Sequence, residues 1–157
     1  MPELFVFLTN ILLLIILSAF FSSSETALTA VSEARIHELA LQGNKKAVTI
    51  EKILAKKEKM ISTILIGNNL VNIVASVYAT SFAISFFGEF DLIFVTILLT
   101  IVLVIFAEVI PKTYAFSHAD QLSLAVAPII RLIIFLLTPA TFITCLLYTS
   151  DAADDTL

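Results

Sequence analysis

Charge is scarce in this sequence of 157 residues, and so are glycine and cysteine. Charged residues make up 14% of the chain, whereas soluble domains average about a quarter. Hydrophobic residues make up 59%, and the mean hydropathy is +1.04. This balance excludes an ordinary soluble domain and predicts a membrane protein. The three glycines form no glycine-rich phosphate loop, and no strongly basic or acidic face indicates a nucleic-acid partner.

The single cysteine, Cys145, begins a C-terminal string, CLLYTSDAADD, that resembles a translated sequencing adapter. We therefore expect residues 145–157 to be a non-native tail and residues 1–144 to form one transmembrane domain. Without the tail no cysteine remains, so the sequence indicates no redox compartment. The formal net charge moves from −4 to −1 because three aspartates are removed, and we expect the natural protein to continue past this point.

Three long apolar runs predict membrane-spanning helices at about residues 4–24, 60–87 and 92–112. The first contains an 18-residue run, Leu4 to Phe21, that is broken only by Thr9, Asn10 and Ser18. At about 1.5 Å per residue this run is long enough to cross the hydrocarbon layer. A signal peptide is the alternative for this run. The start, MPEL, has no basic residue, however, and the run exceeds the usual apolar length of roughly 7–15 residues. The sequence FGEFD, residues 87–91, predicts the turn between the second and third spans.

A basic amphipathic segment follows the first span and predicts juxtamembrane helices within about residues 32–58, with a break at QGN. Residues 33–59 hold seven of the nine lysines and arginines. Short loops rich in these residues stay in the cytoplasm, so we expect a cell-membrane protein with its N-terminus outside.

Residues 120–144 predict another helix on the cytoplasmic side. Its apolar run, Leu122 to Leu137, contains Pro128 and Arg131, and we expect Pro139 to close it. A fourth span and a helix lying along the inner membrane interface both fit this pattern.

Polar side chains gather at three places in the spans, and by the predicted topology all three lie toward the cytoplasmic half of the membrane. They could therefore converge. Each group has a structural alternative, because hydroxyls cap or pack helices and asparagines join helices by hydrogen bonds. The candidate site residues are Ser22 and Ser24 in FFSSSETAL, Asn68, Asn69 and Asn72 in IGNNLVN, and Glu108 in FAEVIPK.

Glu108 ends an apolar run three residues before Pro111. A carboxylate within a span is costly unless it is paired, protonated or facing water, so Glu108 is a functional candidate. The alternative is an interfacial ion pair with Lys112, at i and i+4. Pro111 has no N–H, so the carbonyl of Ala107 loses its helical partner and offers another oxygen beside Glu108.

All the groups in these clusters are oxygen ligands: a carboxylate, side-chain amides, hydroxyls and a freed carbonyl. His37 and His118 lie outside the clusters. This set favours a hard cation such as Mg²⁺ or Ca²⁺ over zinc or copper, with Glu25 available as a second charge. No nucleophile–base pair is visible, so we do not predict an enzyme.

The segments FFSSSETALTAVS, ILIGNNLVN and FAEVIPKTYA resemble the three signature segments of the transmembrane domain of the CorC / cyclin-M (CNNM) magnesium transporters. The resemblance covers residues 4–139. It implies a homodimer in membrane lipid, with three spans per subunit, a belt of juxtamembrane helices and a Mg²⁺ site open to the cytoplasm. It also implies the ligands, which are foremost Ser22, Asn72 and Glu108, and then Ser24, Asn68, Asn69 and the carbonyl beside Pro111.

This sequence departs from the family pattern in two respects. Ser23 stands where many relatives have glycine. The nucleotide-binding CBS-domain pair that usually follows this domain in the cytoplasm is absent from the sequence. The resulting hypothesis is a transporter that exports Mg²⁺ through a site that binds the dehydrated ion. A membrane regulator that senses Mg²⁺ and a structural anchor without transport activity are the alternatives.

Overall fold

The computed structural model describes residues 2–87 and 92–154, and every element in this part of the chain is a helix, which confirms the predicted all-α membrane protein. The predicted turn at 87–91 lies, apart from Phe87, outside the described residues. The elements in chain order are α1 (Pro2–Ala30), α2 (Glu33–Leu41), α3 (Lys45–Leu54), α4 (Lys57–Phe87), α5 (Leu92–Leu103), the π-helix η1 (Val104–Val109), α6 (Ile110–Ser117) and α7 (Ala119–Asp154).

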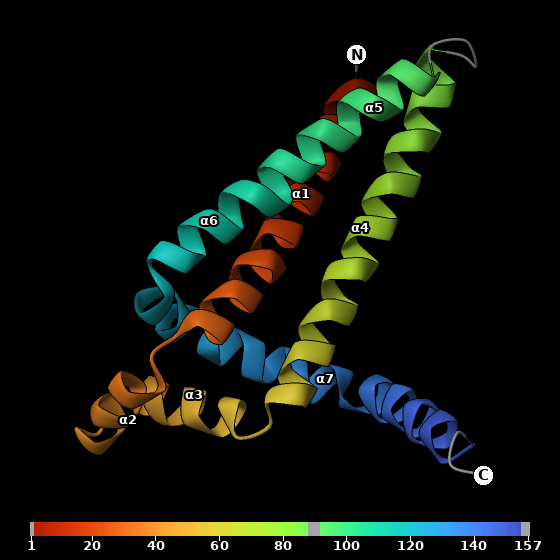
Figure 1. Cartoon of the computed structure of the whole chain (residues 1–157). Coiled ribbons are helices and arrows are strands. Elements are labelled where there is room, and N and C mark those ends of the chain that lie inside the picture. Colours follow the sequence, from red (N-terminus) through yellow and green to blue (C-terminus); the bar gives the residue numbers. More distant parts are fainter. Residues whose placement is uncertain (1, 88–91, 155–157) are drawn as a thin grey trace.

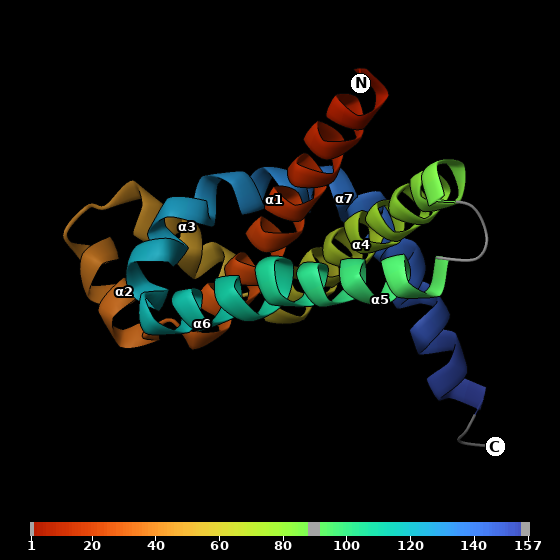
Figure 2. The ribbon, with the colours of Figure 1, turned by 90° about the horizontal axis from the view of Figure 1, so that it is seen from above.

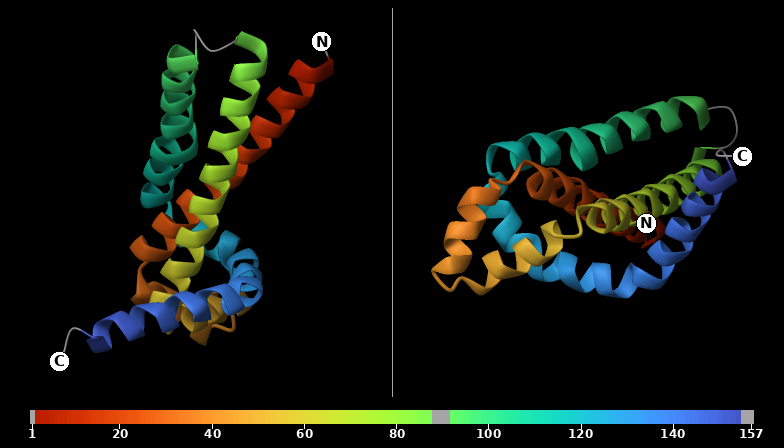
Figure 3. Two further views of the ribbon diagram at one scale, coloured as in Figure 1. Left: turned by 90° about the vertical axis from the view of Figure 1, so that its right-hand side faces the viewer. Right: turned by 60° about the horizontal axis from the view of Figure 1, so that its bottom comes forward.

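Three long rods form the body of the molecule: α1, α4 and the continuous α5–η1–α6 (Figure 1). Helix α1 contacts both of the other rods. Within the described residues, four segments are long and apolar enough to cross a membrane: Glu3–Ala30, Lys57–Ser85, Thr96–Ser117 and Ala119–Thr138. The last of them belongs to α7, which lies across the ends of the three rods instead of beside them (Figures 1 and 3). This arrangement favours three spans and an interfacial fourth helix.

Helices α2, α3 and α7 form a layer at one end of the rods, which we call the belt (Figure 1). Seen from above, α2 and α3 project to one side of the rods (Figure 2). The predicted break at QGN separates them. Gly43 has a φ of +87°, and the N–H groups of Gly43 and Asn44 bond the carbonyls of Ala40 and Leu39, which is a Schellman motif that ends α2. The Asn44 side chain then caps α3 by accepting from two backbone N–H groups.

Helix α7 runs through both Pro128 and Pro139 and curves around the end of the rods (Figure 3). The prediction that Pro139 closes the helix is therefore wrong, and the helix expected at 120–144 extends from Ala119 to Asp154. Proline removes one hydrogen bond and bends a helix, and around Pro128 the buried Val126, Ala127 and Ile130 pack into the main core, which compensates this loss. The foreign origin of residues 145–157 stays a prediction.

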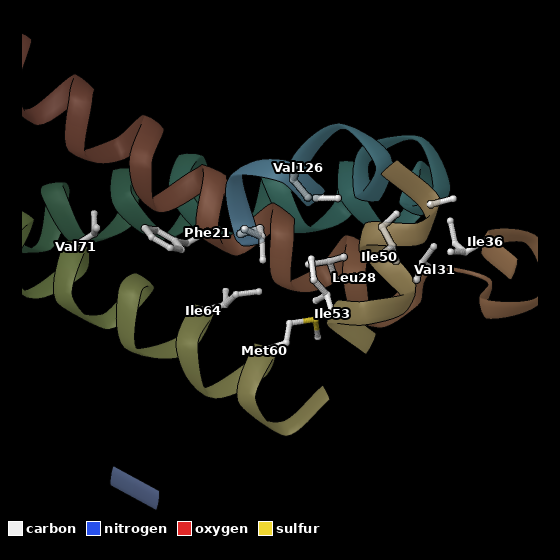
Figure 4. Close-up of a cluster of buried hydrophobic side chains, with 13 residues drawn as sticks. Phe21, Leu28, Val31, Ile36, Ile50, Ile53, Met60, Ile64, Val71 and Val126 are labelled. Atoms are coloured by element: carbon white, nitrogen blue, oxygen red, sulfur yellow. The ribbon is translucent and has the colours of Figure 1, made fainter. Parts of the chain in front are cut away.

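The main hydrophobic core lies where the rods meet the belt (Figure 4). Leu28 from α1, Ile50 from α3, and Met60 and Ile64 from α4 are fully buried there. Near the other end of the rods, Phe7 stacks on Phe82 with 3.7 Å between ring centroids. Large apolar side chains elsewhere on the rods stay exposed, which is expected for surfaces that face lipid.

Asp120, at the start of α7, ties the belt to the end of α1. One carboxylate oxygen accepts from the Ser32 backbone N–H at 3.1 Å, and the other lies 3.2 Å from an Arg35 guanidinium nitrogen. Ser32 is also the N-cap of α2. The α1–α2 junction is thereby held against α7, which sets the belt relative to the rods.

Candidate functional site

Asn72 on α4 joins polar groups from all three rods. Its Oδ1 accepts a hydrogen bond of 2.7 Å from the Ser18 hydroxyl on α1. Its Nδ2 lies 3.5 Å from Oε1 of Glu108 in η1. Two of the predicted residues, Asn72 and Glu108, are therefore brought into direct contact, although 36 positions separate them in the chain.

Ser18 is a residue of this cluster that the sequence reasoning missed. It is buried, and its hydroxyl also lies 3.2 Å from Oδ1 of Asn68. A hydroxyl has one proton, so it donates along the shorter contact to Asn72 and leaves Asn68 as a second polar neighbour. The available signal was spacing, because Ser18 and Ser22 are one helical turn apart on α1, as Asn68 and Asn72 are on α4. We call Ser18, Asn68, Asn72 and Glu108 the polar cluster.

Glu108 is held by an unusual helical turn. Val104–Val109 form a π-helix, and the N–H of Ile110 bonds the carbonyl of Ile105, five residues back. Pro111 follows directly and has no N–H for the buried Ala107 carbonyl. The widened turn lets the rod continue into α6 past the proline, and π turns of this kind are frequent at functional sites. Glu108 makes no ion pair with Lys112 in the structure, so the pairing alternative is not realised among the described side chains.

Ser22, Ser24 and Thr63 are buried hydroxyls without any hydrogen-bond partner in the described part of the chain. Most other serines and threonines in the rods donate to the carbonyl one turn earlier, as Thr26 does to Ser22. A buried polar group that lacks a partner is costly and points to a bound water or ion as its partner. Ser22 and Ser24 were predicted site residues, and Thr63 was not.

Ser24 and Asn69 stand apart from the polar cluster. Ser24 is two positions after Ser22, and residues at this spacing do not face each other on a helix. Asn69 follows Asn68 directly, and its side chain is exposed. The structure thus gathers Asn68, Asn72 and Glu108, leaves Ser22 one turn from Ser18, and turns Asn69 to another side of α4.

A glycine lets α1 and α4 approach closely beside the polar cluster. A Cβ added at Gly67 would lie 2.6 Å from Cε1 of Phe21. Gly67 precedes Asn68, and Phe21 precedes Ser22. This close approach therefore sets the separation of the two helix faces that carry Ser18, Ser22, Asn68 and Asn72.

The chemistry of the site is that of oxygen donors. No group of three or more His, Cys, Asp or Glu side chains able to hold a metal occurs in the described residues. A cation here would be held by one carboxylate together with hydroxyl and amide oxygens, a set that suits Mg²⁺ or Ca²⁺. Glu25, the predicted second charge, is partly buried, and its carboxylate forms no hydrogen bond or ion pair among the described residues.

These features define a polytopic all-α membrane protein with a partly buried polar cluster between its long helices. The sequence matches the family described as the cyclin M transmembrane N-terminal domain over residues 9–150. The chain belongs to this family. The match ends within the C-terminal tail.

Curated relatives carry the same segment. The chain is 36% identical over 107 residues to the UPF0053 inner membrane protein YfjD of Escherichia coli, covering 68% of this chain and 25% of that protein. It is 39% identical over 113 residues to a UPF0053 protein of Haemophilus influenzae, covering 72% and 27%. It is 30% identical over 144 residues to the UPF0053 protein YhdT of Bacillus subtilis, covering 83% and 31%. The chain thus spans only about a quarter to a third of the length of these relatives.

Proposed function

We propose that this chain is the membrane domain of a divalent-cation transporter that exports Mg²⁺. The observation that carries the proposal is the contact of Asn72 with both Ser18 and Glu108, which unites oxygen ligands from three rods. The unpartnered hydroxyl of Ser22 lies one turn from Ser18. Ligands on separate rods can be parted by a relative movement of the rods, as alternating access requires.

Each ligand has a distinct role in this proposal. Glu108 supplies negative charge, and the oxygens of Asn68, Asn72 and Ser22 replace water in the shell of the ion. Mg²⁺ demands near-octahedral oxygen ligands at about 2.0–2.1 Å and gives up water reluctantly. A set of ligands with a single carboxylate therefore lets the ion keep some of its water. Such a set binds Mg²⁺ weakly enough to release it as well as to capture it.

The contact between Asn72 and Glu108 suits such an exchange. At 3.5 Å it is beyond the usual hydrogen-bond range, so breaking it costs little. A cation that enters between the two side chains would turn the Asn72 oxygen toward itself and take the Glu108 oxygen as a ligand. The Ser18 hydroxyl, 2.7 Å from Oδ1 of Asn72, would keep its hydrogen bond to this oxygen, which has a second lone pair for the ion.

The distribution of lysines and arginines determines the proposed orientation in the membrane. The belt carries most of the lysines and arginines, so it lies on the cytoplasmic side and the N-terminus lies outside. Assembly into a homodimer, and control by a cytoplasmic CBS-domain pair in the longer protein, are further parts of the proposal. Ser24 and Asn69 would bind the ion only if the rods rotate during transport.

The test is Mg²⁺ flux from liposomes that contain the purified chain alone, read with an internal Mg²⁺ indicator. Glu108→Gln should abolish flux and weaken Mg²⁺ binding by calorimetry at least about 100-fold, because it removes the only charge in the cluster. Glu58→Gln, an exposed acid in the first turn of α4, is the matched control and should leave both unchanged.

The outcomes separate the alternatives. Binding without flux in the wild type would favour a Mg²⁺-sensing regulator. Wild-type binding and flux in Glu108→Gln would overturn the site assignment, and a wild type with neither binding nor flux would favour a structural anchor.

A further inference from the structure

A basic cavity lies at the junction of α3, α4 and α7, at the belt end of the molecule. Its volume is about 510 Å³, and four of its lining residues are cations, drawn from the end of α3, the start of α4 and the middle of α7. These cations are Lys52, Lys56, Lys59 and Arg131, of which Lys56 lies in the connection between α3 and α4. Arg131 interrupts the apolar run of α7, and this cavity explains its position.

No described acid neutralises these cations. None of the lining residues is acidic, and none of the four cations forms an ion pair with a described residue. Glu51, the acid of α3, lies 2.7 Å from His37 and lines a different cavity. Four like charges around one cavity repel one another, and an anion bound among them would relieve that repulsion.

Apart from Thr49 and Thr138, the rest of the lining is apolar. Ile53 and Met60 are buried, and Phe135 on α7 is 76% exposed. Leu132 and Leu136 extend the same exposed apolar surface along α7. A ligand for this cavity therefore has an anionic group next to a hydrophobic part.

We propose that the cavity binds the phosphate headgroup of an anionic phospholipid, with the acyl chains lying along the apolar surface of α7. The cavity is lined by the end of α3, the start of α4 and α7. These elements lie at the belt end of the rods, which is the depth at which headgroups meet a membrane protein (Figure 1). Basic pockets between helices on the cytoplasmic side are typical sites for such headgroups. A free phosphate would match the four cations but would leave the exposed Phe135 and its neighbours without a partner. The proposal does not depend on Mg²⁺ transport.

The test is a titration of the purified chain in neutral detergent with dioleoyl phosphatidylglycerol, followed by native mass spectrometry. Phosphatidylcholine serves as the neutral lipid and inorganic pyrophosphate as the soluble anion. We expect phosphatidylglycerol to bind more tightly than either. The double substitution Lys52→Gln with Arg131→Gln should weaken its binding by about twentyfold, or about fivefold for each charge.

Two further pairs of substitutions control for general effects of charge. Lys45→Gln with Lys46→Gln removes the same charge from α3 outside the cavity and should change binding less than about twofold. Lys52→Arg with Arg131→Lys preserves the charge and should bind as the wild type does. The two neutral substitutions are also measured singly, so that misfolding of the double variant does not hide the result.

Three results would overturn the proposal. An equal loss of binding in both neutral pairs would show attraction to the whole basic surface. If pyrophosphate displaced the lipid, and the substitutions of Lys52 and Arg131 weakened pyrophosphate binding as much as lipid binding, the cavity would be a site for a soluble anion. Wild-type affinity in the cavity variants would show that the cavity is not the site.

Discussion

Asn72 lies between Ser18 and Glu108, 2.7 Å from the hydroxyl of the first and 3.5 Å from a carboxylate oxygen of the second. The two contacts differ in strength, because the shorter is an ordinary hydrogen bond and the longer is at the outer limit. Asn72 is thus anchored to α1 and only loosely attached to η1. Movement of the third rod would break the weaker contact first.

Replacing Asn72 should impair both stability and Mg²⁺ binding. Asn72→Leu keeps the size but removes the nearer acceptor of the buried Ser18 hydroxyl, which is left with the Asn68 oxygen at 3.2 Å, so the unfolding free energy should fall by about 0.5–1.5 kcal/mol. Mg²⁺ affinity should fall at least about tenfold, as measured by calorimetry. Asn69→Leu, at an exposed neighbouring position, is the control and should change neither. An unchanged affinity in Asn72→Leu would remove Asn72 from the site.

Ser18 should act through Asn72 and not as an independent ligand. Ser18→Ala removes the bond that orients the amide, and Mg²⁺ affinity should fall about tenfold to 100-fold, as for other residues that support a ligand. The double variant Ser18→Ala with Asn72→Ala should bind no worse than Asn72→Ala alone. Calorimetry on the four proteins of this cycle measures the coupling. Additive losses would instead make Ser18 a direct ligand.

Ser22 offers a test in which stability and binding change differently. Its buried hydroxyl has no partner, so Ser22→Ala should keep the unfolding free energy within about 1 kcal/mol of wild type, or raise it. Mg²⁺ affinity should nevertheless fall. The neighbouring Ser23 donates to the Phe20 carbonyl at 3.1 Å, so Ser23→Ala should lose about 0.5–1.5 kcal/mol and bind normally. Thermal unfolding without Mg²⁺ and calorimetry with it separate the two variants. Normal binding in Ser22→Ala would exclude Ser22 as a ligand.

Gly67 should be required for the close approach of α1 and α4. In Gly67→Ala the new methyl group would press on the buried ring of Phe21, and we expect a loss of about 1–3 kcal/mol and weaker Mg²⁺ binding. Phe21→Leu, added to this variant, should restore part of both by making room. A Gly67→Ala protein with wild-type unfolding temperature and affinity would show that the two helices separate at no cost.

Periodicity and composition predicted the helices well and their ends poorly. The second span was expected from residue 60, whereas α4 begins at Lys57. The third was expected to end near 112, whereas α6 continues to Ser117. Proline misled the prediction in α7, because the helix continues past Pro139, and a proline can bend a helix without ending it. Helix ends depend on tertiary contacts and on caps, which hydropathy does not measure.

The candidate site was recovered in part from spacing. Asn68 and Asn72 share a helix face, as predicted from their separation of four residues, because both face Ser18, and Glu108 lies against Asn72. Ser18 and Thr63 were missed because a lone hydroxyl in an apolar run looks the same in sequence whether it bonds its own helix or another one. Asn69 was included with its neighbours, although adjacent residues point to different sides of a helix.

The sequence by itself determined the class of this protein, the approximate positions of its long apolar helices and the supply of oxygen ligands, because these follow from composition and period. Only the tertiary structure decided that α7 lies across the rods, that a π turn presents Glu108, and that Ser18 and Asn72 meet. Such outcomes depend on how helices pack against one another, as Gly67 against Phe21 shows, and packing is a property of pairs of surfaces that no single segment encodes.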